Sequence, residues 1–219
     1  MKTINIKHLF LIFAFGGFLV SCQKEVDLQN LTHPQPGGGN GGSNNYNIIG
    51  NWNFVGMTAI TKTTITAGTG IDQEKIISSY GFISQKNKGT ITIDASKFTS
   101  AGLGYSIDTV VKTEIYLGGI LFDSLETDFK IDMPLSSGSV AYKAIGTDSI
   151  YFDSGFITLQ SPDSTGIPGA TTAAGYIISW LSDTLVMKMQ QSNSSIQDVN
   201  GVNAQVANNI SQIVKLKRQ

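Results

Sequence analysis

Cysteine and histidine are almost absent from this chain, and several kinds of chemistry are excluded with them. The 219 residues contain one cysteine, Cys22, and two histidines, His8 and His33, all of them before residue 46. Residues 46–219 therefore cannot form a disulfide, a Ser-His-Asp or Cys-His catalytic group, or a metal site built on those ligands. Within residues 46–219 the P-loop, G-x-G-x-x-G and S-x-x-K motifs are missing as well.

Carboxylates are the one type of catalytic side chain that residues 46–219 retain in number. A pair of them can hydrolyse glycosidic bonds, but the acids here fall mostly at the starts or on the polar faces of expected strands. Asp148 and Asp153 lack the D-x-D-x-D-G spacing of a calcium loop. We therefore expect a protein that is not an enzyme and that uses neither a cofactor nor a metal.

Charge is also scarce, and arginine is nearly missing. Charged residues make up 14% of the chain, with 15 basic and 16 acidic side chains, and Arg218 is the single arginine. The basic residues are scattered along the sequence. A nucleic-acid-binding surface needs clustered positive charge, so we expect no nucleic-acid partner.

The chain has one long apolar run, and it lies at the N-terminus. Leu9–Val20 is uninterrupted by polar residues and follows Lys2 and Lys7. As a helix the run would span only ~18 Å, against about 30 Å for the hydrocarbon core of a bilayer. A basic start followed by a short apolar run predicts a cleaved signal peptide over residues 1–21.

The residues at the predicted cleavage site resemble the lipobox of bacterial lipoproteins. They are Leu19-Val20-Ser21-Cys22. In that family the cysteine sulfur receives a diacylglyceryl group, the signal is cut before the cysteine, and the new amino group is acylated, palmitate being a common chain. The resemblance implies that Cys22 is lipidated and anchors the protein, because two or three acyl chains hold a protein on a membrane durably. An ordinary signal peptide with a chance cysteine is the alternative.

The residues after the cysteine bear on which membrane and which face carry the protein. Gln23 in place of aspartate resembles lipoproteins of the outer membrane. Lys24, Glu25 and Asp27 resemble the surface-export signal of Bacteroidota lipoproteins, although solvated charges in a tether would look the same. The resemblance implies an outer-membrane lipoprotein on the cell surface, with the periplasmic face as the alternative.

A polar segment separates this anchor from the rest of the chain. Gln29–Asn45 is dominated by glycine, asparagine and proline and has no apolar periodicity. Such a composition buries too little surface to repay the entropy of ordering it. We therefore expect a flexible tether over residues 22–45 and a single folded domain over residues 46–219, which is long enough for one core.

Alternating apolar and polar residues predict an all-β domain. The apolar residues recur at every second position in three runs: 111–117, 129–133 and 185–189. This period indicates strands with one buried face, and Asn200-Gly201 is typical of a two-residue hairpin turn. We expect about 8–10 antiparallel strands in an up-and-down barrel, with a two-sheet sandwich as the alternative. Ala204–Ile210 is the one segment that suggests a helical turn.

The two ends of the domain resemble the lipocalin and calycin families, and in particular the lipocalin-like lipoproteins of Bacteroidota. The resemblance rests on Gly50-Asn51-Trp52 at the first strand and on the basic final segment, Gln212–Gln219. It implies an up-and-down barrel in which the arginine near the C-terminus lies across the tryptophan ring. Carried over, it makes Trp52 and Arg218 a barrel-closing pair within about 6 Å of each other.

An aspartate followed by serine or threonine recurs five times. The hydroxyl residues are Thr109, Ser124, Ser149, Ser164 and Thr184. Aspartate and serine favour turns, so the pattern is expected to mark the start of strands. It also resembles the O-glycosylation site of exported Bacteroidota proteins, and the two interpretations are compatible.

Three functions remain open for such a domain. A barrel of eight strands has room for side chains or for one small ligand, so a small apolar ligand is one expectation. Carbohydrate binding is a second, and it would need exposed aromatic side chains from the set Tyr80, Tyr105, Tyr142, Tyr151 and Trp180. A structural lipoprotein of the envelope that has no ligand is the third.

Overall fold

A computed structural model describes residues 48–154, 173–199 and 201–219. The predicted signal peptide, Cys22, the predicted tether and Ser164 lie outside these ranges. Among the described residues, no helix is long and apolar enough to cross a bilayer. The strands are β1 (Gly50–Ala67), β2 (Glu74–Ile83), β3 (Gln85–Ile93), β4 (Lys97–Leu117), β5 (Ile120–Ile145), β6 (Ser149–Phe152), β7 (Ala174–Leu181), β8 (Thr184–Val199) and β9 (Val202–Arg218), with a short 3₁₀ turn, η2 (Gly70–Asp72).

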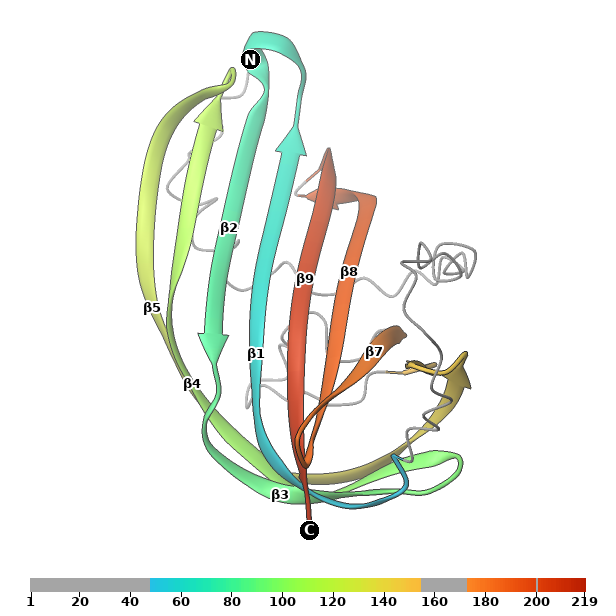
Figure 1. Cartoon of the computed structure of the whole chain (residues 1–219). Coiled ribbons are helices and arrows are strands. Elements are labelled where there is room, and N and C mark those ends of the chain that lie inside the picture. The colour runs from blue at the N-terminus through green and yellow to red at the C-terminus, as the bar shows by residue number, and fades with distance from the viewer. Residues whose placement is uncertain (1–47, 155–172, 200) are drawn as a thin grey trace.

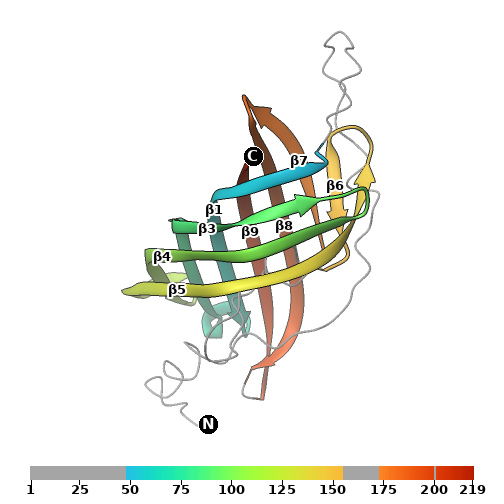
Figure 2. The same cartoon turned by 90° about the horizontal axis from the view of Figure 1, so that it is seen from below.

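The nine strands form one antiparallel sheet that closes on itself. Their order is β2-β1-β3-β4-β5-β6-β7-β8-β9, and β1 also pairs with β9. That last pairing joins the first strand to the final one over residues 52–67 and 204–218. Figures 1 and 2 show the resulting ring of strands from the side and from below. The prediction of an all-β antiparallel barrel is therefore confirmed, and the sandwich alternative is wrong.

Strands β2 and β3 occupy a single position in the wall of the barrel. The first residues of β1, Gly50–Asn53, pair with β3, whereas residues 58–67 pair with β2. Strand β4 pairs with both in the same way. The break falls at Ser84, whose backbone N–H donates to the Met57 carbonyl (2.8 Å) and whose Oγ accepts from the Met57 N–H (2.7 Å). The nine strands thus fill eight positions around the barrel.

The hairpin between β8 and β9 has the predicted two-residue turn. Val199 pairs with Val202, and Gly201 has a φ of +81°, which glycine adopts without steric cost. Asn200 itself is outside the described residues. The expectation of a helical turn over Ala204–Ile210 is wrong, because this segment belongs to β9 and pairs with β1 on one side and β8 on the other. Two ladders of backbone hydrogen bonds outweigh a weak local preference.

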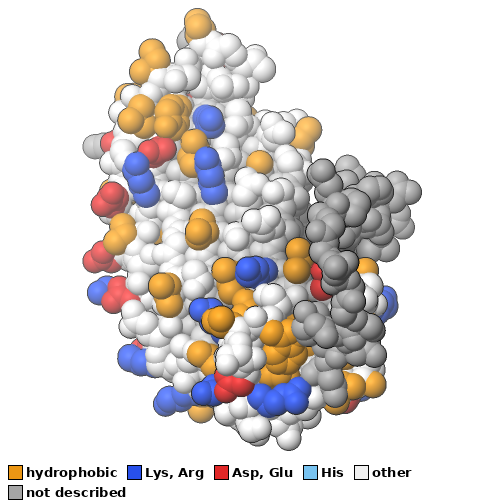
Figure 3. Space-filling view, in the orientation of Figure 1, with side chains coloured by type: hydrophobic (Ala, Val, Ile, Leu, Met, Phe, Trp, Pro, Cys, Tyr) orange, Lys and Arg blue, Asp and Glu red, His pale blue; other side chains and the backbone are white. Residues whose placement is uncertain are grey.

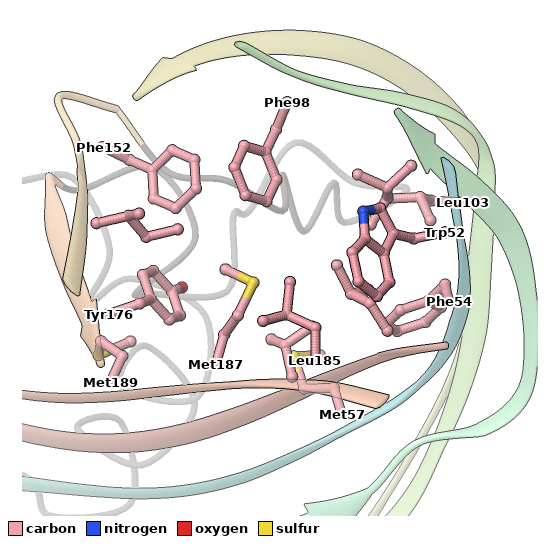
Figure 4. Close-up of a cluster of buried hydrophobic side chains, with 14 of the residues drawn as sticks. Trp52, Phe54, Met57, Phe98, Leu103, Phe152, Tyr176, Leu185, Met187 and Met189 are labelled. Atoms are coloured by element: carbon pink, nitrogen blue, oxygen red, sulfur yellow. The ribbon is translucent and has the colours of Figure 1, made fainter. Parts of the chain in front are cut away.

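Large apolar side chains form a buried cluster inside the barrel, and Figure 4 shows them pointing toward one another from the surrounding strands. Trp52, Phe98 and Phe152 are fully buried. The rings of Phe98 and Phe152 meet edge to face at 5.0 Å, and Tyr176 continues the cluster at 5.6 Å from Phe152. Edge-to-face contact is a preferred geometry for aromatic pairs. The apolar face predicted for residues 185–189 lies here too, with Leu185, Met187 and Met189 all buried.

The outer face of the barrel is polar, as expected of a sheet that packs on one side only. Figure 3 shows lysines, acidic residues and apolar side chains, some of the apolar ones in small groups, over the face in view. Ion pairs join some of them, such as Lys130 with Asp108 at 3.3 Å and Lys143 with Asp153 at 3.0 Å. These side chains are more than half exposed, so each pair adds little to stability.

Candidate binding site in the barrel interior

The lower end of the barrel is closed around Trp52. Its indole is fully buried, and the ring nitrogen donates to the Ile48 carbonyl at 3.0 Å. The Arg218 guanidinium carbon lies 4.9 Å from the centre of the Trp52 ring, inside the 6 Å that the lipocalin resemblance implied. It also lies 6.0 Å from the ring of Trp180, which is 5.5 Å from Trp52. One guanidinium therefore covers two indoles.

Backbone hydrogen bonds hold the C-terminal residues in this position. Trp52 and Arg218 are directly paired between β1 and β9. The Arg218 N–H donates to the Asp183 carbonyl and the Gln219 N–H to the Asn51 carbonyl, each at 3.1 Å. The last residues are therefore tied to strands on both sides instead of fraying, and the arginine keeps a defined place at the barrel end.

Strand pairing is continuous around the lower end of the barrel. Toward the other end, among the described residues, the pairing between β5 and β8 through β6 and β7 is interrupted. Strands β5 and β8 are linked through β6 and β7, and these ladders are short. β5 pairs with β6 only over Tyr142–Ile145, and β7 pairs with β8 only up to Lys188. Among the described residues, β5 before Tyr142 pairs only with β4, and β8 beyond Lys188 pairs only with β9. Figure 1 shows these two strands as the margins of a curved sheet.

The inner face of this curved sheet carries small polar and branched apolar side chains. Ile65 is opposite Ile76 on β2 and Val206 on β9. Two residues earlier on β1, and on the same inner face, the Thr63 hydroxyl donates to Asn208 Oδ1 at 2.8 Å. Thr63, Ile65, Ile76 and Asn208 are half-buried, although Val206 and Ala204 on β9 are buried. The aromatic cluster at the lower end, which forms the floor of the barrel, is fully buried by contrast. The interior therefore changes from a filled core to a partly open surface along the barrel axis.

Hydroxyl and amide groups lie between the filled floor and the half-buried inner face above it. The Tyr176 hydroxyl donates to Gln212 Oε1 at 2.8 Å, and the Gln212 amide donates to the Met57 sulfur. The Tyr80 hydroxyl shares a hydrogen bond with Thr61, whose side chain is 8% exposed. Burial raises the pKa of both tyrosines above their ordinary value, so they are neutral hydrogen-bonding groups at physiological pH.

The aromatic residues considered for carbohydrate binding are mostly part of the interior. Tyr80 stacks on Phe82, and Trp180 packs against Trp52. Tyr105 is 5% exposed. Tyr142 meets the edge of Phe98 at 5.0 Å, while Tyr151 alternates with buried neighbours and so lies on the outer face. Four of the five thus serve the core instead of forming a flat exposed surface on which a sugar could stack.

The Asp-Ser/Thr pattern marks the start of a strand in two cases and not in two others. Ser149 begins β6 and Thr184 begins β8, and each hydroxyl donates to the preceding aspartate, at 3.0 and 3.4 Å. Thr109 and Ser124 instead lie inside β4 and β5, so the turn interpretation is wrong for them. Thr109 is half-buried and donates to the Gly81 carbonyl at 2.6 Å, whereas Ser124 is exposed. Ser164 is outside the described residues.

Sequence reasoning singled out Tyr80 and Tyr105 only as candidate sugar-stacking aromatics and missed their role in the interior. The alternation of Leu103, Tyr105 and Ile107 would have indicated that this tyrosine faces inward. The polar partners come from other strands, so no local motif contains them. Within the ranges that the structure describes, no group of three or more His, Cys, Asp or Glu residues is placed to hold a metal ion.

The fold and the interior together define an antiparallel β-barrel with one closed end, a filled floor and a parted wall. Comparison of the chain with family models, with curated proteins and with solved structures gives no match.

Proposed function

We propose that this protein is a membrane-anchored binding protein whose lipocalin-like barrel holds a small, mainly apolar ligand and catalyses no reaction. The observation that carries the proposal is the change in the interior along its axis. The floor around Phe98, Phe152 and Met187 is filled, whereas the inner face above it is half-buried where β5 and β8 part. A small barrel with one open side is a common form of ligand site.

The anchoring part of the proposal rests on the sequence. Cys22 in a lipobox-like context would carry the lipid, and the charged residues after it favour display at the surface of the outer membrane. The Gly50-Asn51-Trp52 motif and the contact between Trp52 and Arg218 support the lipocalin-like interpretation, since the contact has the geometry that the resemblance implied.

The position of the aromatic residues favours this function over carbohydrate binding. Stacking on a sugar needs exposed rings, and Tyr80, Tyr105 and Trp180 instead pack inside the barrel. A purely structural role is the remaining alternative, and the experiment below separates it from ligand binding.

The test is direct recovery of a ligand, combined with a matched pair of variants. Protein purified from its native host is extracted with organic solvent, and the extract is analysed by mass spectrometry for stoichiometric small molecules. Ile65→Glu places a charge on the inner face, while Ile60→Glu places one on the outer face of the same strand, where the side chain is 61% exposed. We expect Ile65→Glu to abolish ligand recovery and Ile60→Glu to preserve it. Equal recovery from both variants, or none from the wild type, would overturn the proposal.

A further inference from the structure

A buried hydroxyl without a partner lies on the inner face of the barrel. Tyr105, on β4, is 5% exposed, and its hydroxyl has no hydrogen-bonding partner among the described residues. Its ring packs 6.1 Å from Phe54 in the floor, and its backbone is opposite Met133 on β5. Phenylalanine would make the same ring contacts without burying a donor. A buried donor that stays unpaired costs stability, so an acceptor that the described residues do not supply, such as a ligand atom, would remove this cost.

The side chains around Tyr105 indicate the chemical nature of the molecule that carries such an acceptor. Phe54, Leu103 and Met133 line the barrel beside it and are all buried. The neighbouring hydroxyl, that of Tyr80, is already engaged by Thr61 and lies close enough to act electrostatically on Tyr105. A ligand reaching this level from the open side would therefore meet one free donor within apolar surroundings.

The charges on the inner face decide between a neutral and an ionised ligand. The strand register puts Glu74 and Asp123 on the same face as Ile76 and Ile115, toward the open end. Both are acidic. Among the described residues, the one cation on the inner face is Arg218, which lies at the closed end over Trp52. A carboxylate buried at Tyr105 would have no positive partner, and an unpaired buried charge is strongly unfavourable.

We propose that the Tyr105 hydroxyl donates a hydrogen bond to the carbonyl oxygen of a neutral, otherwise apolar ligand, such as a fatty-acyl ester, a ketone or an amide. This inference rests on the proposed binding function and specifies the chemical class of its ligand. Tyr105 selects for the carbonyl, and the apolar walls bind the hydrocarbon part. The acids at the open end act against anionic chains of the same length.

The experiment compares three ligands that share one hydrocarbon chain: methyl laurate, laurate and dodecane. Affinities are measured with the full-length lipoprotein, for wild type and for Tyr105→Phe, which removes only the hydroxyl. Tyr151→Phe on the outer face is the matched control. We expect Tyr105→Phe to weaken methyl laurate binding by roughly threefold to tenfold, the effect of one neutral hydrogen bond. Dodecane should bind both proteins equally, and laurate should bind wild type more weakly than its methyl ester.

An infrared measurement distinguishes the loss of this hydrogen bond from a defect in packing, because packing alone does not change the frequency of the carbonyl stretch in this way. The stretch of a ¹³C-labelled ester carbonyl should shift to lower frequency on binding to wild type and to Tyr151→Phe, but not on binding to Tyr105→Phe. Without ligand, Tyr105→Phe should unfold at the same temperature as wild type or a higher one. A clear loss of stability would show that the hydroxyl is bonded to an internal water, which would overturn the inference.

The other outcomes separate this inference from the function on which it rests. If methyl laurate and dodecane both bind wild type but Tyr105→Phe changes neither affinity, the ligand site exists and the assignment of Tyr105 is wrong. If laurate binds more tightly than its ester, the neutral class is wrong. If none of the three binds wild type, the proposed function itself fails.

Discussion

Replacing Arg218 by lysine tests whether the contact with Trp52 closes the lower end of the barrel. The guanidinium carbon lies 4.9 Å from the Trp52 ring centre and 6.0 Å from that of Trp180. Lysine keeps the positive charge but cannot stack a planar group on an indole. A cation–π contact contributes about 0.5–2 kcal/mol, so we expect Arg218→Lys to lower the free energy of unfolding by about 1 kcal/mol.

Thermal unfolding followed by circular dichroism can detect a change of this size. For a domain of this length, 1 kcal/mol corresponds to a fall in Tm of about 2–4 °C. Arg218→Ala should cost more, because it also removes the aliphatic stem that covers the rings. The matched control is Lys217→Arg. Lys217 is on the opposite face of β9 and forms an exposed 3.6 Å ion pair with Asp183, so this change should stay within about 0.5 kcal/mol of wild type.

A double-mutant cycle isolates the contact itself. Trp52→Phe will destabilise the domain because the indole is fully buried. In the Trp52→Phe background, Arg218→Lys should cost measurably less than in the wild type, since the larger ring is gone. The reasoning is refuted if Arg218→Lys costs the same in both backgrounds, or if it has no more effect than Lys217→Arg.

Three further predictions concern the anchor, the modification sites and a turn. Cys22→Ser should move the protein from the membrane fraction to the soluble fraction and abolish labelling with palmitate; continued labelling would exclude lipidation at Cys22. If the Asp-Ser/Thr sites carry glycan in the native host, Ser124→Ala should reduce the excess mass of the intact protein. Thr109→Ala should not, because that hydroxyl is half-buried and bonded to Gly81; the opposite order would contradict the structure. In the turn between β3 and β4, the Ser96 and Lys97 N–H groups donate to the Asp94 carboxylate and lower its pKa. The lowered pKa means that this contribution is present above the ordinary aspartate pKa and is lost as the pH falls through the folded-state value. The gap in Tm between wild type and Asp94→Asn should therefore be present at neutral pH and shrink in acid, and a gap that widened in acid would refute this assignment.

Much of the fold is predictable because a strand with one buried face has a simple period. The alternation at Leu185, Met187 and Met189 identifies the inner face of β8, and Asn200-Gly201 identifies the turn that follows it. Both signals are local, since each depends on residues within one strand or one hairpin. The resemblance to lipocalins also anticipated a non-local contact, that of Trp52 with Arg218, from residues at the two ends of the domain.

The errors arise where long-range pairing outweighs local preference. Ala204–Ile210 suggests a helical turn, yet it is a strand because β1 and β8 supply partners on both edges. Thr109 and Ser124 follow aspartates that suggest strand starts, yet both lie within long strands. Turn propensity is worth little against a continuous ladder of backbone hydrogen bonds, and that ladder depends on residues distant in the sequence.

The sequence by itself determined the class of the domain, the orientation of the faces of several strands and the candidate anchor at Cys22. Only the tertiary structure decided that one sheet closes through β1 and β9, that its wall parts between β5 and β8, and that Tyr105 is left with an unpaired hydroxyl. The physical reason is that side-chain alternation repeats identically in a barrel and in a sandwich. Closure, strand register and the pairing of a buried donor depend on which strands meet, and those partners are separated by many tens of residues.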